Sequence, residues 1–180
     1  DIFTRVITDR AIEFDRIIPG YSGPLYAEIS PLTFSVLVHQ GSRLSQLRLR
    51  RGSFLTTEGV SFTVDLIGFE VGYNQNKIIG YKAKQHAGVI DIENVDHYKL
   101  MDFWDPIVAR SDKTLILDPD EFYILASKES VSVPPDQAAE MRAYDTLVGE
   151  FRVHYAGFFD PGFGHGAAGG GGSRAVLEVR

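Results

Sequence analysis

The sequence predicts an all-β fold, mainly β with one or two short helices. Short apolar runs rich in Val, Ile and Thr recur along the chain, and turn residues separate them. The 12 Phe, 8 Tyr and 18 Gly among 180 residues favour strands and turns over helices. The clearest helix signal is at 137–142, because two prolines and an aspartate precede it. Many short strands between turns are typical of a barrel or a sandwich.

Composition narrows the class of protein. With 44% hydrophobic residues the chain can bury the core of one domain or two small ones. Its net charge of −6 argues against a general affinity for nucleic-acid backbones. The sequence has no cysteine, which excludes disulfides and thiolate metal sites. No apolar run approaches membrane-spanning length and no signal peptide is recognisable, so we expect a cytoplasmic protein.

Three common catalytic arrangements find no support in the sequence. The five histidines lack metal-binding spacing, and without cysteine they cannot form the zinc site of a zinc-dependent nucleobase deaminase. No serine stands in a nucleophile-elbow context, which argues against a Ser-His-Asp triad. The glycines 169–172 are not followed by Lys-Ser or Lys-Thr, so they do not form a phosphate-binding P-loop.

One turn and the strand after it organise the first part of the chain. Pro19 presets a turn and Gly20 permits a positive φ, so we expect the chain to reverse before an extended segment at 25–29. Along that strand Tyr26 and Glu28 share one face, opposite an apolar face. A carboxylate beside an aromatic ring suits a general base, although a solvated glutamate on an ordinary hairpin gives the same pattern.

A similar order of residues recurs near the other end of the sequence. A turn at 160–163, with Asp160, is followed by glycines and by an aliphatic strand at 175–179 that carries Glu178. Self-similarity over so long a distance predicts a duplicated domain, with the boundary near Gly52. We therefore expect Glu28 and Glu178 to lie on equivalent strands.

The remaining elements follow from alternation and turn chemistry. Further strands are predicted at 1–8, 31–38, 43–49, 62–67, 77–81, 88–92, 114–117, 122–127 and 130–133. The segment 96–110 has no clean period and is either an irregular excursion or a short helix. Three arginines at 48, 50 and 51 form either an anion site or a solvated edge that blocks strand addition.

These motifs resemble a known family. Arg16 to Gly23, with Glu28 after four more residues, is similar to the signature R-I-D-P-G-aromatic-x-G and catalytic Glu of the dCTP deaminase branch of the trimeric dUTPase-like superfamily. The run 41–47 is similar to the family's later G-x-R/K-I-x-Q-L strand. Asp160 to Phe163 with Glu178 matches the signature again, as in the long, internally duplicated bacterial deaminases.

The resemblance implies a dUTPase-like β-barrel or β-clip fold in two incomplete copies. Residues 1–52 would be the C-terminal part of the first copy, and 53–180 the N-terminal and central part of the second. Ile18 and Phe158 depart from the family, which has Asp and Arg there. The family's Ser-Ser-x-x-Arg loop would precede Asp1 in the first copy, and the corresponding region 142–147 of the second copy lacks its Ser and Arg.

The resemblance also implies a mechanism and partners. Glu28 would be the general base in the hydrolytic deamination of dCTP, with Glu178 as its second-copy equivalent and no zinc. Substrate-binding residues would be Arg16, Tyr21, Gln46 and Asp160. Mg²⁺ would be bound through the substrate triphosphate. Sites in this family form between the subunits of a trimer, so a homo-oligomer or a pseudo-trimeric assembly is expected.

Two alternatives remain open. A dUTP pyrophosphatase on the same fold needs an aspartate to activate water at the α-phosphate, and Asp160 is the motif aspartate available for it. A non-catalytic module that binds nucleotide or supports assembly is favoured by the missing Ser and Arg residues.

Overall fold

A computed structural model describes residues 2–10, 16–46, 59–71, 76–141, 157–166 and 171–180. The chain forms two compact units, one from Asp1–Thr56 with Lys84–Phe103 and the other from Thr57–Ala83 with Trp104–Arg180. Strands dominate both, and the described elements include one short helix, α1 (Leu100–Phe103). The prediction of a mainly β protein is therefore confirmed. No helix in these ranges has the length and apolar character needed to cross a membrane.

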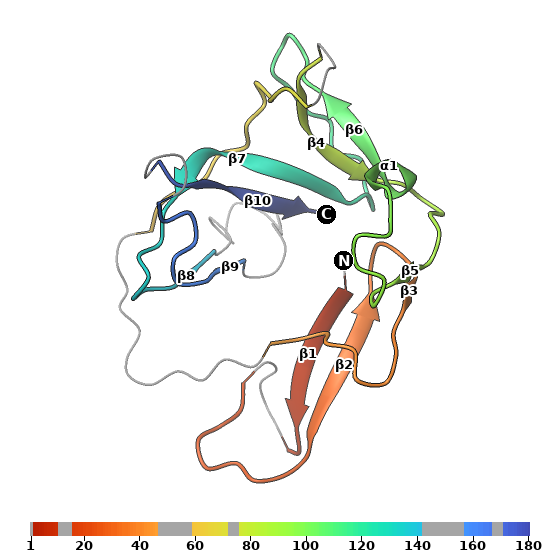
Figure 1. Cartoon of the computed structure of the whole chain (residues 1–180), viewed down its shortest axis with the longest axis vertical. Coiled ribbons are helices and arrows are strands. Elements are labelled where there is room, and N and C mark those ends of the chain that lie inside the picture. The colour runs from red at the N-terminus through yellow and green to blue at the C-terminus, as the bar shows by residue number, and fades with distance from the viewer. Residues whose placement is uncertain (1, 11–15, 47–58, 72–75, 142–156, 167–170) are drawn as a thin grey trace. The chain divides into compact units, whose positions relative to one another are not determined.

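The first unit is built on two strand pairs. Strands β1 (Ile2–Thr8) and β2 (Leu25–Pro31) run antiparallel over their full length, as the first two arrows in Figure 1 show. Strand β3 (Val36–Leu37) pairs in parallel with β5 (Ile90–Asp91), which comes from much later in the sequence. Two rings flank the ring of Phe103 edge-on, with centroid distances of 5.4 Å to Phe34 and 5.5 Å to Tyr98. This aromatic cluster attaches α1 to the segment before β3.

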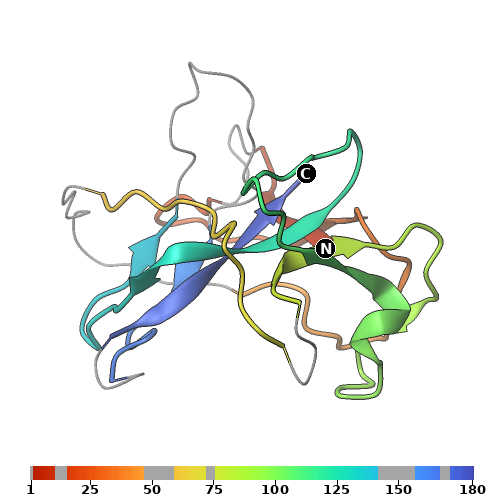
Figure 2. The same ribbon diagram turned by 90° about the horizontal axis from the view of Figure 1, so that it is seen from above.

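The second unit contains a four-stranded antiparallel sheet in the order β10-β7-β4-β6. Its strands are β4 (Ile78–Ala83), β6 (Trp104–Val108), β7 (Tyr123–Val131) and β10 (Ser173–Val179). The two long strands β7 and β10 lie side by side in both Figure 1 and Figure 2. A separate pair joins β8 (Ala139–Glu140) to β9 (Phe158–Phe159).

The core of the second unit lies on one face of this sheet. Alternate residues of β10 are buried, with Ala175, Leu177 and Val179 each at most 5% exposed. They pack with Tyr123 and Leu125 of β7. The remaining members of the buried cluster are Val133 and Phe159. This alternation places Glu178 on the opposite face of β10.

Several predicted elements differ from the observed ones. The helix expected at 137–142 is wrong over its described part, because Ala139–Glu140 is a strand that pairs with Phe158–Phe159. Ala139 and Met141 pack on the core, and the Met141 N–H donates to the Gly157 carbonyl at 2.6 Å. Long-range pairing therefore overrides the local helix signal.

Other strand predictions were too long. The segment predicted at 31–38 contains only Val36–Leu37 as a new strand, and 62–67 contributes a single bridge from Val64 to Ser127. Residues 114–117 and 43–46 are irregular, while 47–49 and the three arginines lie outside the described residues. The strands predicted at 122–127 and 130–133 merge into one continuous strand, β7.

Candidate functional site

The turn before β2 has the geometry that its sequence predicts. The Tyr21 N–H donates to the Ile18 carbonyl at 3.2 Å, and Gly20 between them has φ +83°. Proline at the second turn position and a glycine with positive φ at the third are features of a type II turn. The chain then enters β2 at Leu25, as expected.

Tyr21 closes this turn through its side chain. Its phenol donates to the Pro24 carbonyl at 2.7 Å and accepts from the Asp9 N–H at 3.3 Å. A Cβ atom at Gly23 would stand 2.6 Å from the Tyr21 hydroxyl oxygen, so any other residue there would require the Tyr21 ring to move. The structure thus joins Tyr21 to the start of β2 and to the end of β1.

Glu28 lies in the middle of β2 with an exposed side chain. Its cross-strand partner on β1 is Arg5. The same face of the β1–β2 pair carries Tyr26 and Ser30 beside Glu28, and Phe3 beside Arg5. Ile7, opposite Tyr26, completes this face, so Glu28 lies exposed beside one cation, one serine and three apolar or aromatic side chains.

Tyr26 is coupled to Asp9, a residue that the sequence analysis did not select. The negative charge of the Asp9 carboxylate, with partial desolvation and a hydrogen bond to Asp9, raises the pKa of the Tyr26 phenol above 10.0. Tyr21 adds to this effect. One acidic residue therefore links both tyrosines of the motif at the end of the hairpin where the chain connects β1 to β2.

Two further predicted substrate-binding residues lie in irregular segments. Arg16 and Gln46 are exposed and belong to no strand. A cavity of about 420 Å³ is lined by Gly41, Arg43, Ile92 and Glu93. Gln46 lies three residues after Arg43 in the sequence and is not one of the lining residues. Of the lining residues, Glu93 accepts a hydrogen bond from the Ser42 hydroxyl at 2.6 Å. Neighbouring residues also make contact, with His39 Nε2 at 3.1 Å from Asp91 Oδ1.

The turn at 160–163 repeats the geometry of the turn at 18–21. The Phe163 N–H donates to the Asp160 carbonyl at 3.0 Å, and Gly162 has φ +86°. Asp160 is exposed at the start of this turn. Both motifs therefore fold as an x-Pro-Gly-aromatic turn with the same hydrogen bond and nearly the same glycine conformation.

Glu178 occupies a different environment from Glu28. It is half-buried on β10, and its cross-strand partner on β7 is Ile124, which in turn pairs with Tyr81 of β4. The row of neighbours across the sheet is therefore apolar or aromatic, whereas Glu28 faces an arginine. Each glutamate lies on a strand that follows a Pro-Gly turn, but their surroundings differ in charge and burial.

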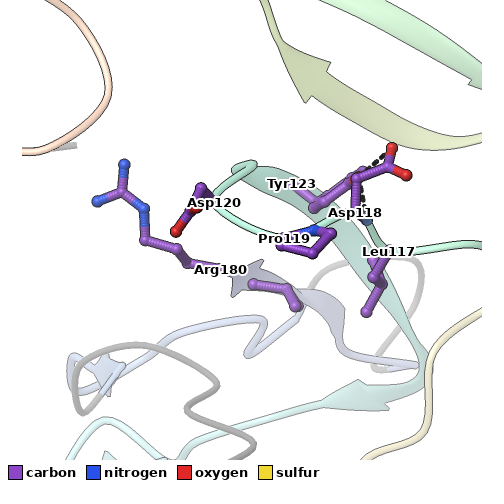
Figure 3. A pocket seen from close by; sticks show the side chains of 7 residues that line it. Leu117, Asp118, Pro119, Asp120, Tyr123 and Arg180 are labelled. Carbon is purple, nitrogen blue, oxygen red and sulfur yellow. Dashed lines mark hydrogen bonds between the residues drawn. The ribbon is translucent and has the colours of Figure 1, made fainter.

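A second cavity lies beside the end of β10. It has a volume of about 460 Å³, and Figure 3 shows Asp118 and Asp120 on either side of Pro119, with Asp118 toward Tyr123 and Asp120 toward Arg180. The Lys82 ammonium donates to Asp118 at 3.1 Å and lowers the pKa of that carboxyl. None of the residues that line this cavity was among the site residues predicted from the sequence.

Comparison with known proteins identifies the family of this chain, which the geometry alone does not. The model of the 2'-deoxycytidine 5'-triphosphate deaminase C-terminal domain matches residues 37–180, and that of the N-terminal domain matches residues 1–53. The chain belongs to the 2'-deoxycytidine 5'-triphosphate deaminase family.

A solved member of this family has the same fold. The crystal structure of 2'-deoxycytidine 5'-triphosphate deaminase from Agrobacterium tumefaciens is 55% identical in sequence and superimposes with a TM-score of 0.91. The match covers 100% of the present chain and 59% of the Agrobacterium chain, so the chain spans less than two thirds of that deaminase. No curated protein sequence matches the chain significantly.

Two features of this deaminase-family chain's candidate site were not predicted from the sequence. The contact between Asp9 and the two tyrosines depends on how the hairpin closes. The pairing of Arg5 with Glu28 depends on strand register, which alternation alone does not fix. Alternation does place Arg5 on one face of its strand. Combined with the hairpin geometry, it could have predicted that Arg5 shares a face with Glu28.

Proposed function

We propose that the protein containing this chain is a dCTP deaminase, which converts dCTP and water to dUTP and ammonia. Membership of the deaminase family over residues 37–180 carries this proposal. The 55% identity to the Agrobacterium enzyme supports it, as does the exposed carboxylate of Glu28 on the strand after the signature turn. In pyrimidine metabolism such a reaction supplies dUTP for dTTP synthesis.

In the proposed mechanism Glu28 is the general base. Its carboxylate takes a proton from water, the resulting hydroxide attacks C4 of cytosine, and the carboxylic acid of Glu28 passes that proton to ring N3. The carboxylate of Glu28 then takes the remaining proton from the C4 hydroxyl of the tetrahedral intermediate and delivers it to the amino nitrogen, which leaves as ammonia while the C4 carbonyl forms. The sum is one water consumed and one ammonia released, with Glu28 restored.

The remaining site residues would bind the nucleotide. Tyr21 packs near the sugar or base, Arg16 fixes the nucleotide or local backbone, and Gln46 and Asp160 complete the set. The hydrogen bonds of Tyr21 to Pro24 and Asp9 support a rigid position for its ring. Glu178 is proposed as the second-copy equivalent of Glu28, without the same catalytic partners.

We also propose that the chain contains two related copies of a dUTPase-like β-barrel or β-clip domain, with 1–52 from the first and 53–180 from the second. The two Pro-Gly turns support this, since their hydrogen bonds are 3.2 and 3.0 Å long and their glycine φ angles are +83° and +86°. Each turn precedes a seven-residue strand that carries a glutamate.

The proposed partners follow from the substrate. Mg²⁺ would accompany the triphosphate oxygens of the nucleotide, and the described ranges contain no group of three or more His, Asp or Glu side chains that could hold a metal ion. A homo-oligomer, as a trimer or pseudo-trimer, is supported by the exposed apolar side chains of Leu25 and Ile29 on a two-stranded pair that needs further packing. We propose a cytoplasmic location.

One experiment separates this function from its alternatives. The full-length protein is incubated with dCTP or dUTP in the presence of Mg²⁺, and the products are resolved. Ammonia and dUTP from dCTP are expected. Pyrophosphate and dUMP from dUTP would instead identify a dUTP pyrophosphatase, for which Asp160 is the candidate aspartate. Nucleotide binding without either product would identify a binding module.

A further inference from the structure

The register of the first hairpin pairs two charges that the sequence separates by 22 residues. Strands β1 and β2 comprise seven residues each. Among these residues Arg5 is the sole cation and Glu28 the sole anion. The antiparallel register places them directly opposite each other. Directly opposed residues on one face have Cβ atoms about 4.5–5.5 Å apart, within reach of an arginine and a glutamate.

Arg5 contacts a neighbour on its own strand. The Arg5 guanidinium carbon lies 4.3 Å from the centroid of the Phe3 ring, which is the geometry of a cation–π contact. Phe3 and Arg5 are two residues apart and therefore on the same face as Glu28. This contact keeps a delocalised cation on the face that carries the proposed base.

We propose that Arg5 is a positioning residue for Glu28, and that Phe3 holds Arg5 in place for this role. This inference rests on the proposed function, in which Glu28 moves the proton. It adds a residue outside the turn-and-glutamate signature that brought Glu28 to attention. Arg5 acts on the carboxylate of Glu28 and is not assigned a contact with the substrate.

The need for such a residue follows from the exposure of Glu28. A glutamate on an open strand samples several rotamers, and a general base works only when its oxygen lies within about 2.6–3.2 Å of the water proton donor. A misplacement of about 1 Å can cost about 100-fold in rate. Opposed charges on an exposed face contribute little to folding stability, so the effect of Arg5 is expected in turnover.

The second copy offers a natural contrast. The partner of Glu178 is Ile124, and no cation occupies the equivalent position. If an opposed cation orients the catalytic glutamate, then Glu28 has such a cation across the strand and Glu178 does not.

The test compares four variants of the full-length protein. Arg5→Met removes the charge, Arg5→Lys keeps it, and Phe3→Leu removes the ring beneath it. Arg10→Met is the matched control, since it removes the same charge from an exposed residue just beyond β1. Two quantities are measured: steady-state kinetics of ammonia release from dCTP, and the carboxyl carbon NMR signal of Glu28, which is identified by its loss in Glu28→Gln.

The proposal expects a specific pattern. Arg5→Met should lower kcat by about 10- to 100-fold with little change in KM, and should shift the Glu28 carboxyl signal. Arg5→Lys should recover most of kcat, and Phe3→Leu should show a smaller loss than Arg5→Met. Arg10→Met should leave both quantities unchanged.

Other results would overturn it. A Glu28 carboxyl signal that does not move in Arg5→Met, or a raised KM with unchanged kcat, means that Arg5 does not orient the base. If the wild-type protein releases no ammonia from dCTP, the proposed function fails, and the carboxyl signal still decides whether Arg5 orients Glu28.

Discussion

Arg174 and Asp65 lie 109 residues apart in the chain, yet the Arg174 Nη1 donates to the Asp65 Oδ2 at 2.6 Å. The other Asp65 oxygen accepts from the backbone N–H groups of Ile67 and Gly68, at 2.9 and 3.3 Å. The Asp65 side chain is only 6% exposed. Arg174 directly precedes the irregular register of β10, so this contact ties the strand of Glu178 to a distant loop.

Asp65→Asn should destabilise the protein at neutral pH. Burial raises the pKa of Asp65, but the donors at Ile67, Arg174 and Gly68 outweigh it, and the net pKa lies below 3.8. A pKa that is lowered in the folded state stabilises the fold above the unfolded value and loses this effect as pH falls through the folded value. We expect a loss of about 1–3 kcal/mol at pH 7, measured by urea denaturation.

The pH dependence provides the internal check. The difference between wild type and Asp65→Asn should shrink as pH falls below about 3.8, because the wild-type carboxylate is then protonated as well. The control is Asp112→Asn, which removes a half-exposed partner of Arg110 and should change the midpoint very little. A difference that stays constant with pH would contradict the ionic role of Asp65.

Gly80→Ala should disturb the centre of the four-stranded sheet. Gly80 on β4 lies between Leu125 of β7 and Ile107 of β6. An added Cβ would clash with the Ile124 carbonyl oxygen and stand 2.8 Å from a Leu125 methyl carbon. Because the first obstacle is backbone, relief requires the strands to move, and we expect a loss of about 1–3 kcal/mol in unfolding free energy.

Gly88→Ala is the matched control for this substitution. A Cβ at Gly88 meets nothing within 4 Å, and its φ is not in the left-handed region. Such a change should be neutral or raise stability by about 0.4–1 kcal/mol through the unfolded state. Thermal unfolding of both variants measures the contrast, and equal melting temperatures would refute the close approach of β4 and β7.

Asp9→Asn should lower the pKa of Tyr26 toward 10.0. The Asp9 carboxylate is the largest cause of the raised pKa, because its charge opposes ionisation of the phenol. A pKa raised by folding contributes stability below the unfolded value and loses it as pH rises through the folded value. The titration is followed by NMR of ring-labelled tyrosine, with Tyr26→Phe to assign the signal.

Asp96→Asn, at an exposed aspartate in a turn, serves as the control and should leave the Tyr26 titration unchanged. If Asp9→Asn has no effect either, the contact between Asp9 and Tyr26, at the end of the hairpin where the chain connects the two strands, is absent in solution.

Local signals in the sequence were sufficient for the elements around the two turns. Pro-Gly dipeptides and alternation predicted β2 and β10, because turn chemistry and face alternation depend on neighbouring residues only. Strand β6 was missed since Pro106 interrupts its pattern. It lies at the edge of the sheet, where one side needs no backbone donor and proline is tolerated.

Non-local pairing set the limit of prediction. The parallel pairing of Val36–Leu37 with Ile90–Asp91 leaves no trace in either segment, because each strand has two residues. Likewise, β8 pairs with β9 in the segment where the local sequence predicted a helix at 137–142. For the candidate site, the sequence predicted Glu28 and its turn but not its partner Arg5, since a shift of one residue in register would pair Glu28 differently.

The final prediction decides between the two glutamates. Glu28→Gln keeps the size of the side chain and its hydrogen-bonding reach but removes its ability to accept a proton. In the full-length protein it should lower the rate of dCTP deamination by at least about 10²–10⁴-fold while nucleotide affinity stays close to wild type. Turnover is measured as ammonia release, and affinity by calorimetry with dCTP and Mg²⁺.

Glu178→Gln is the matched variant at the second position. Glu178 is half-buried opposite Ile124 and has no cationic partner across the strand, so its substitution should affect turnover far less than Glu28→Gln. Loss of activity in Glu178→Gln with activity retained in Glu28→Gln would assign catalysis to the second copy. Equal loss in both, with unchanged nucleotide affinity, would mean that both glutamates act in the reaction and that charge pairing does not distinguish them.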